Sequence, residues 1–440
     1  MSRQVTRRRF VQTTAAAATI GYFVNPTEAQ ESNSPNEKLN IAAVGATGRA
    51  GANVAGVSTQ NIVAIADVDR SLLEKGSVKY ANARKYRDYR KMLEKEEKNI
   101  DAVVVGTPDH SHAPAAAMAL RLKKHVYCEK PLTHTVYEAR TLANLAKENN
   151  LVTQMGTQIH SLDNYRRVVE LIETKAIGEV KEVHVWASAV YTGAKFTTNT
   201  TAPDHLDWDL WLGPAQKRPY SEGVHPFKWR SFWDYGTGSL GDFGCHYMDL
   251  AHWALKLQNP TSVVAEGPAY DPVSTPAWCI ANYEYPPREK LPALKLTWYD
   301  SGKKPEQLQR VVARGPKDQD GKPMSTNSGQ LFVGDKGMLL SNYGQRSLLP
   351  TKDFSDFKPP EPYIAKSIGH HAEWLNAIKN GGPTTCNFEY SGGLAESVLL
   401  GTVAYRAGEK IEWDSENLKV TNSAKAQQFV HKEYRKGWTL

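Results

Sequence analysis

Residues 38–67 read KLNIAAVGATGRAGANVAGVSTQNIVAIAD and hold the pattern that decides the fold. The first run, Lys38–Val44, is apolar and rich in residues that favour extended backbone, which indicates a buried strand. A glycine-rich turn at 45–51 follows at once and leads into a helical stretch. A second apolar run, Asn61–Ala66, ends in Asp67. This order predicts a strand–helix–strand unit of a parallel sheet.

The same order is the fingerprint of dinucleotide binding. Glycine lets the backbone approach a pyrophosphate, and the helix N-terminus adds N–H donors and a positive dipole end. The turn departs from the G-x-G-x-x-G form, because Thr47 and Ala50 stand where glycine is usual. We therefore predict cofactor contacts from the turn itself, at Gly45, Thr47, Gly48 and Arg49.

Asp67 indicates which dinucleotide is bound. A carboxylate after the second strand binds both ribose hydroxyls of NAD and repels the 2′-phosphate of NADP. Arg49 acts in the opposite direction, because its positive charge would favour a phosphate. NAD is the predicted cofactor, with NADP as the alternative.

Further strand-like runs alternate with helical segments, which predicts a doubly wound parallel sheet, a Rossmann domain, over residues 38–157. The strand candidates are Ile100–Gly106, His125–Glu129 and Leu151–Gln154, and the helical segments are Tyr86–Glu97, Ala113–Leu122 and Val136–Glu148. Ligands of such sheets bind at the carboxyl ends of the strands. Polar residues at these ends complete the predicted cofactor site: Thr107, Pro108, His110, Glu129, Lys130 and Gln158. His110 and His112 have no third ligand at a convincing spacing, so no metal is predicted.

A segment from Gly238 to Leu255 carries the predicted catalytic groups. Asp242, His246 and Asp249 follow an i, i+4, i+7 spacing, which places them on one face of a helix. Oxidation of a hydroxyl-bearing carbon requires a base for the hydroxyl proton, and histidine has a suitable pKa. Asp242 could orient His246, join a proton relay or cap the helix. Three other readings remain open: a structural His246, a zinc site of the three residues, and either a substrate contact or a structural role for Asp249.

Two residues before this segment are candidate substrate contacts. The apolar faces of sugars stack on aromatic rings, and Arg230 could bind hydroxyls or carboxylates beside Trp229. The chain has 11 Trp and 20 Tyr, so a core role for Trp229 stays open. The remaining part of residues 158–440 is predicted as an α+β domain. Its strand candidates are Glu179–Ser188, Val263–Glu266, Ala281–Tyr285, Leu294–Trp298 and Gln330–Val333, and its helical candidates are Tyr165–Thr174, Glu361–Lys379 and Gly393–Arg406.

The N-terminus has the parts of an export signal. Arg7, Arg8 and Arg9 precede a weakly apolar stretch rich in alanine, and small residues close it near Ala29. The adjacent arginines predict a twin-arginine signal over 1–29, followed by a linker over 30–37. The predicted location is therefore periplasmic or secreted, with the twin-arginine export machinery as a partner.

Composition excludes several classes of protein. The 440 residues are 40% hydrophobic and 23% charged, as in globular proteins of two domains. Net charge is +7, part of it from the N-terminal arginines, with no basic stripe that would indicate nucleic-acid binding. No run approaches the length of a membrane span. The four cysteines lack CxxC pairing and are predicted to be buried free thiols.

Taken in order, the glycine turn, Asp67, Thr107-Pro-Asp-His110 and Glu129-Lys130-Pro131 resemble the Gfo/Idh/MocA oxidoreductases. Leu206–Pro214 and His371–Leu375 resemble blocks of a secreted branch of that family. The resemblance covers residues 38–440. It implies a second domain with a large open mixed or antiparallel sheet, a homo-oligomer, and catalysis by Lys130 with Asp242 and His246. It also implies a sugar or polyol as the small-molecule substrate.

The leading hypothesis is an exported NAD-dependent oxidoreductase that acts on a sugar or polyol hydroxyl. A periplasm-like compartment has no free nicotinamide pool, so the cofactor would be tightly held. A second hypothesis is a redox-neutral glycoside hydrolase, lyase or epimerase that uses NAD transiently. A third is a non-catalytic sugar-binding protein, in which Lys130→Ala or His246→Ala would leave sugar binding unchanged.

Overall fold

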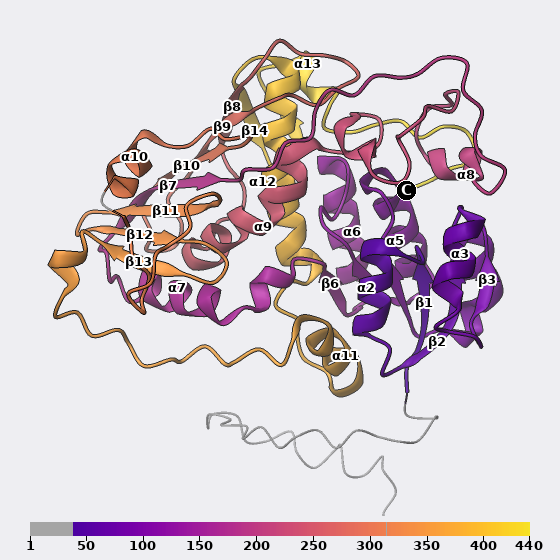
Figure 1. Ribbon diagram of the computed structural model, residues 1–440, viewed down its shortest axis with the longest axis horizontal. Helices are drawn as coiled ribbons and strands as arrows, with labels where there is room; N and C mark the ends of the chain where they lie inside the picture. Colours follow the sequence, from indigo (N-terminus) through magenta and orange to yellow (C-terminus); the bar gives the residue numbers. More distant parts are fainter. Residues whose placement is uncertain (1–37, 314) are drawn as a thin grey trace, which may run out of the picture. The chain divides into compact units, whose positions relative to one another are not determined.

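The computed structural model describes residues 38–313 and 315–440. The predicted signal (1–29) and linker (30–37) lie outside the described residues. Two sheets organise the rest, one of six strands and one of nine (Figure 1). None of the described helices is long and apolar enough to cross a membrane.

The first sheet is fully parallel, with strand order β3-β2-β1-β4-β5-β6. Its strands are β1 (Asn40–Val44), β2 (Asn61–Ala66), β3 (Arg84–Tyr86), β4 (Ala102–Val105), β5 (His125–Cys128) and β6 (Thr153–Met155). The helices between them are α2 (Gly48–Gly56), α3 (Arg70–Ser77), α4 (Tyr89–Glu96), α5 (His112–Arg121) and α6 (Val136–Glu148). This order is that of a doubly wound dinucleotide-binding sheet, so the predicted α/β fold is confirmed.

Ala50 packs in the place where the fingerprint has its last glycine. A Cβ added to Gly45 or Gly106 would lie 2.8 or 2.7 Å from the Ala50 Cβ, which is closer than real Cβ contacts allow. The two glycines therefore leave the room that the Ala50 methyl group occupies. Gly45 also has φ +102°, a backbone conformation that favours glycine. Close packing of helix α2 on β1 and β4 is kept despite the substitution in the fingerprint.

The second sheet has the order β13-β12-β11-β7-β10-β9-β8-β14-β15 and is antiparallel except for the β7–β10 pair. Its strands are β7 (Val180–Trp186), β8 (Ser262–Glu266), β9 (Ile280–Tyr285), β10 (Leu294–Tyr299), β11 (Gly329–Gly334), β12 (Met338–Ser341), β13 (Arg346–Leu349), β14 (Ile411–Asp414) and β15 (Lys419–Val420). The predicted large mixed sheet of an α/β protein is confirmed.

Long helices join this sheet to the first domain. The helices of this part are α7 (Asp163–Glu173), α8 (Trp208–Leu212), α9 (Gly238–Leu255), α10 (Glu306–Val312), α11 (His370–Asn380), α12 (Phe388–Ala407) and α13 (Ala424–Gln427). Helix α12 packs against both α9 and α6 (Figure 1). Gly392 lets α12 approach α6 closely, and Arg140 of α6 pairs with Glu396 of α12 through two hydrogen bonds of 2.7 and 2.8 Å. These contacts fix α9, and the groups it carries, relative to the parallel sheet.

Two helices begin well away from their predicted first residues: the one predicted over Gly393–Arg406 begins at Phe388, and the larger error is at α11. The sequence predicts a helix over Glu361–Lys379, but α11 begins only at His370. The preceding residues are held in a non-helical path, because the Glu170 carboxylate accepts hydrogen bonds from the backbone N–H groups of Tyr363 and Ile364. Gly369, with φ +104°, then starts the helix. The four cysteines are buried free thiols, as predicted.

Candidate active site

A cavity of about 780 Å³ opens at the carboxyl ends of β1, β2, β4 and β5, which is a typical size for a ligand site. Most of the predicted site residues meet in its wall. Those that line it are Gly45, Thr47, Gly48, Arg49, Asp67, Thr107, Pro108, Glu129, Lys130, Gln158, Trp229, Arg230 and His246. Asp242 lies directly behind this wall, whereas His110 and Asp249 lie elsewhere.

The glycine turn leaves room and donors for an anionic ligand. Gly48 has φ +58°, and a Cβ added there would meet nothing within 4 Å. Thr47 caps helix α2 without a side-chain hydrogen bond, so the first N–H groups of the helix are free to bind an anion. The Thr107 hydroxyl, also in the cavity wall, is buried and has no hydrogen-bond partner among the described residues. These features fit the pyrophosphate and ribose of a dinucleotide.

Asp67 lies at the adenosine end expected for a ribose-binding carboxylate. Its two oxygens each accept one backbone hydrogen bond of 3.0 Å, from Ala46 N–H and Asp69 N–H. A carboxylate has about four acceptor sites, so both oxygens can still accept from ribose hydroxyls. Burial raises the pKa of Asp67, the two backbone bonds opposing that effect. Asp67 is therefore placed to accept hydrogen bonds from the ribose hydroxyls.

Arg49 does not act as a free phosphate-binding group. Its guanidinium donates to Glu129 Oε1 at 3.0 Å, and the same oxygen accepts from Asn53 at 2.9 Å and Gln158 at 3.0 Å. Glu129 is thus the acceptor that ties α2, the end of β5 and the turn after β6 together. Because the positive charge of Arg49 is paired with Glu129, it attracts the 2′-phosphate of NADP less. The expected preference for NAD over NADP is therefore stronger.

The strongest polar contact of the site joins the two halves of the chain. Lys130 Nζ lies 2.5 Å from Asp242 Oδ1 and also donates to the Asp242 carbonyl at 3.1 Å. Burial by itself lowers the pKa of Lys130, but the charges of Asp242 and then Glu129 outweigh it and raise the pKa. Burial likewise opposes ionisation of Asp242, and Lys130 and Arg230 hold its pKa below the usual value. Lys130 is therefore a fixed ammonium donor.

His246 provides the complementary group. It lines the cavity, and its Nδ1 is buried without a protein hydrogen-bond partner. Burial, and then the positive charge of Lys130, lowers the pKa of His246 well below 6.5. The imidazole is therefore neutral near pH 7 and able to accept a proton. The Asp242 carboxylate bonds Lys130, and the structure gives no hydrogen bond between Asp242 and His246.

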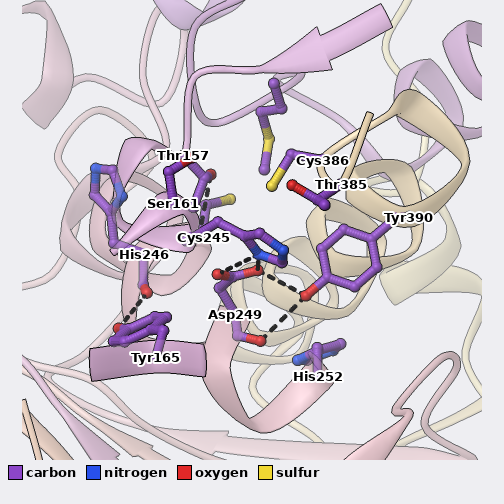
Figure 2. Close-up of polar contacts among 12 residues, drawn as sticks. Thr157, Ser161, Tyr165, Cys245, His246, Asp249, His252, Thr385, Cys386 and Tyr390 are labelled. Carbon is purple, nitrogen blue, oxygen red and sulfur yellow. Dashed lines mark hydrogen bonds and ion pairs between the residues drawn. The ribbon is translucent and has the colours of Figure 1, made fainter. Parts of the chain in front are cut away.

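Asp249 and His110 do not reach the cavity lining. Asp249 accepts a hydrogen bond from His160 Nδ1 at 2.9 Å. It also accepts one from the Tyr390 hydroxyl at 2.7 Å (Figure 2). Figure 2 shows His246 directed away from Asp249, although both stand on α9. Asp242 and Asp249 are seven residues apart, which corresponds to about 10 Å along the helix. Their position on one face of the helix therefore does not bring their side chains together. The ring nitrogens of His110 lie 3.0 and 3.3 Å from the carbonyl oxygens of Trp211 and Tyr235. Burial lowers the pKa of His110 to about 3, so the neutral ring donates to one of the two.

The residues described contain one group of metal-ligand donors, His160, Asp249 and Cys386, all buried and within 4.8 Å of one another. Two of the three already hydrogen-bond each other, and His160 also stacks on Trp253 with 4.1 Å between ring centroids. This arrangement ties α9 and α12 to the turn after β6. The zinc set considered from sequence does not form among the residues described: Asp242 pairs with Lys130, Asp249 pairs with His160, and the donors of Asp242, His246 and Asp249 do not converge.

Several residues of the cavity wall were missed in the sequence. Asp109 lies within the quoted Thr-Pro-Asp-His motif, accepts from the Thr237 hydroxyl at 2.8 Å and lines the cavity. Tyr343 reaches the wall from the turn after β12 and stacks on Tyr247 with 4.4 Å between centroids. The position of Asp109 in a strand-end motif was a usable signal. No local pattern marks Tyr343, because only the sheet brings it to the site.

The fold and the cavity define a class of protein: a dinucleotide-binding domain with a second α/β domain that closes its site. Comparison with family models agrees. Residues 39–157 match the model described as "Oxidoreductase family, NAD-binding Rossmann fold", and residues 176–290 match its partner, "Oxidoreductase family, C-terminal alpha/beta domain". The chain belongs to the Gfo/Idh/MocA oxidoreductase family, and its N-terminal domain is of the NAD-binding type.

Curated relatives align over part of their length. Inositol 2-dehydrogenase of Salmonella typhimurium is 28% identical over 130 residues, 29% of this chain and 38% of that protein. Levoglucosan dehydrogenase of Pseudarthrobacter phenanthrenivorans is 24% identical over 192 residues, 43% of this chain and 42% of that protein. Each alignment thus spans less than half of the relative. GenD2 from gentamicin A biosynthesis, solved with NAD, shares the fold with a TM-score of 0.56 and 19% identity over 86% of this chain and 97% of its own.

Replacing Asp67 by asparagine should reduce the preference for NAD over NADP. The variant keeps an acceptor for the Ala46 or Asp69 N–H group but loses the negative charge. Hydrogen bonds to charged groups contribute about 1.5–3 kcal/mol, so the ratio of NAD to NADP affinity should fall roughly 10- to 100-fold. Titration of cofactor-free protein with each dinucleotide measures the ratio. An unchanged ratio would mean that Asp67 does not contact the ribose.

Proposed function

We propose that this protein is an exported NAD-dependent oxidoreductase that oxidises a hydroxyl of a sugar or polyol and keeps its cofactor tightly bound. The observation that carries the proposal is the pairing of a fixed ammonium donor, Lys130, with a neutral histidine, His246, in one cavity beside the NAD-binding turn. Dehydrogenases of inositol and of levoglucosan among the relatives support the substrate class.

The two groups divide the proton chemistry of the reaction. Bound NAD supplies the acceptor for the hydride that leaves the carbinol carbon. Lys130, oriented by its two bonds to Asp242, donates to the substrate oxygen and stabilises its developing negative charge. The neutral imidazole of His246, which lines the cavity, takes the hydroxyl proton. Asp242 acts through Lys130, since its carboxylate holds the ammonium in place and keeps it charged.

Support for a tightly held cofactor comes from a cover segment, residues 205–230. It lines the cavity through Leu210, Trp211 and His225. His225 bonds Asp69 at 3.0 Å, and the His205 carbonyl accepts from Arg70 N–H at 2.8 Å, so the segment is fastened to the loop after β2. A dinucleotide below it would leave only after these contacts open.

The C-terminal residues hold the cover segment from outside. Arg435 donates to the Gly213 carbonyl at 2.6 Å and to Asp209 Oδ1 at 2.8 Å. Its backbone N–H bonds the Pro214 carbonyl at 3.1 Å. Trp438 then lies 4.0 Å from the Arg90 guanidinium and 6.0 Å from the ring of Tyr89, which lines the cavity.

Arg435→Ala should therefore speed the release of bound NAD, by roughly fivefold to tenfold for the loss of these hydrogen bonds. Exchange of bound NAD against an excess of labelled NAD measures the rate. Lys436→Ala is the matched control, because Lys436 is an exposed neighbour outside the contact. Equal release rates in wild type and Arg435→Ala would show that the cover segment does not retain the cofactor.

We propose export by the twin-arginine route, on the strength of the arginines and the alanine-rich stretch that follow each other in residues 1–29. A reporter fused to these residues should appear in the periplasm. Replacing Arg7, Arg8 and Arg9 by lysine should retain it in the cytoplasm. Unchanged export in the lysine variant would refute the twin-arginine route.

A redox-neutral reaction is the second candidate, because the site holds one more titratable group than a simple oxidation requires. Asp109 lines the cavity, and burial together with the nearby Asp242 charge raises its pKa to about 7. A carboxylic acid that keeps its proton near neutral pH can protonate a leaving oxygen. Release of a monosaccharide from a glycoside, with no external electron acceptor, would favour this candidate; oxidation without cleavage would exclude it.

A further inference from the structure

Arg230 presents a guanidinium group to the cavity in a prearranged position. It stands in the 3₁₀ turn Lys228–Ser231 and lines the cavity. Its guanidinium carbon lies 4.1 Å from the ring of Trp229 and 4.7 Å from that of Phe227. One hydrogen bond of 3.4 Å, to the Phe227 carbonyl, is the single protein contact of its five N–H donors among the residues described. The aromatic rings thus hold the group while its donors stay available.

Other cations in the cavity wall already have partners. Lys130 pairs with Asp242, and Arg49 pairs with Glu129. Arg87 lies 3.6 Å from an oxygen of Asp207. Within residues 38–313 and 315–440, no carboxylate lies within the 4.0 Å ion-pair distance of Arg230. Arg230 is therefore the cation of this wall whose charge is left for a ligand.

Charges around Arg230 leave room for an anion. Asp242 is committed to Lys130, and His246 is neutral because burial lowers its pKa. The positive charge of Arg230 opposes the effect of burial on Asp109, but burial is the larger effect and raises the pKa of Asp109 to about 7. Asp109 therefore carries only part of a negative charge at neutral pH. The ammonium–carboxylate pair is neutral as a unit. The part of the cavity next to Lys130 and His246 thus has an excess of positive charge, and Arg230 contributes it.

We propose that Arg230 binds a carboxylate of the substrate, so that the preferred substrates are acidic sugars such as uronates rather than neutral sugars. Guanidinium binds carboxylate through two parallel hydrogen bonds, and the flanking rings match the apolar face of a sugar ring. The inference rests on the proposed function, since it names the substrate class of the same site. The carboxylate would lie in the same cavity as the oxidised carbon, because Arg230, Lys130 and His246 all line it.

Matched sugars, one anionic and two neutral, test the proposal. NAD-loaded protein is mixed with D-glucose, D-glucuronate and the methyl ester of glucuronate, and with the corresponding galactose series. The formation of bound NADH gives kcat/KM for each. The variants are Arg230→Met, which removes the charge, and Arg230→Lys, which keeps it without the planar fork. Lys228→Met is the matched control, because it removes an exposed cation from the same turn.

The acids should exceed both neutral analogues by roughly 10- to 100-fold in kcat/KM, and Arg230→Met should remove that difference, so that the ratio of acid to neutral kcat/KM within the variant falls to about one. Arg230→Lys should keep part of the preference, and Lys228→Met all of it. Neutral sugars that react as well as acids, or an equal loss for both in Arg230→Met, would overturn the inference while leaving the proposed function intact. Failure of every sugar to reduce the bound NAD would instead refute the proposed function, and the inference with it.

Discussion

Lys130→Met should lower the rate of hydride transfer roughly 10²–10³-fold, the usual effect of removing a preorganised donor from a developing oxyanion. Methionine has nearly the length of lysine but cannot donate to the substrate oxygen. The variant also leaves Asp242 buried without its partner, since the two side chains are 13% and 6% exposed. Single-turnover reduction of bound NAD by a reactive sugar measures the step.

Two controls separate chemistry from folding in that experiment. NAD content of the purified variant should stay close to that of wild type, because the glycine turn and Asp67 are untouched. Loss of a buried charge partner costs about 3–5 kcal/mol, so the variant's thermal stability must be recorded beside its rate. Asp242→Asn, combined with Lys130→Met, should recover stability but not activity. A variant that is folded, loaded with NAD and as active as wild type would remove Lys130 from the mechanism.

His246→Gln should slow the reaction roughly 10²–10⁴-fold, because glutamine keeps a hydrogen bond but cannot accept the hydroxyl proton. The wild-type pH profile follows from the direction of the pKa shift. Burial lowers the pKa of His246 well below 6.5, so the basic form persists as the pH falls through 6.5. Activity should stay level there and decline only at lower pH, when His246 becomes protonated.

The pH profile of kcat/KM and its change in His246→Gln provide the check. In the variant, the acid limb assigned to His246 should disappear, and the remaining rate should vary less with pH. A wild-type limb centred near 6.5 would indicate a solvated histidine and contradict the buried geometry. An acid limb that persists in the pH profile of the variant would mean that another group is the base. Asp109 is then the first candidate, because its pKa is raised.

The sequence predicted the first domain well because its signals are local. The sequence predicts a helix over Val136–Glu148, and helix α6 has the same bounds in the structure, since Thr135 and Glu138 form a capping box at its start. The strands were marked by short apolar runs between turns, and β2 was predicted with its observed bounds. Short edge elements such as β3, at Arg84–Tyr86, were missed because they carry no apolar pattern of their own.

The site was predicted in part for the same reason. Lys130, Asp242 and His246 come together because α12 packs against both α9 and α6, and their motifs are readable in sequence. Asp249 carries the same helical spacing, yet its carboxylate is engaged by His160 and Tyr390 from other elements. The cover segment and its contact with Arg435 join residues more than 200 positions apart. No local pattern encodes such contacts, so they required the fold.

The central claim is that the chain keeps NAD in the cavity between its glycine turn and its cover segment. Mass spectrometry of the small molecules released by denaturing natively exported protein tests this most directly. We expect close to one NAD or NADH per chain. Exported protein that releases no dinucleotide, and that does not bind added NAD or NADP, would contradict it.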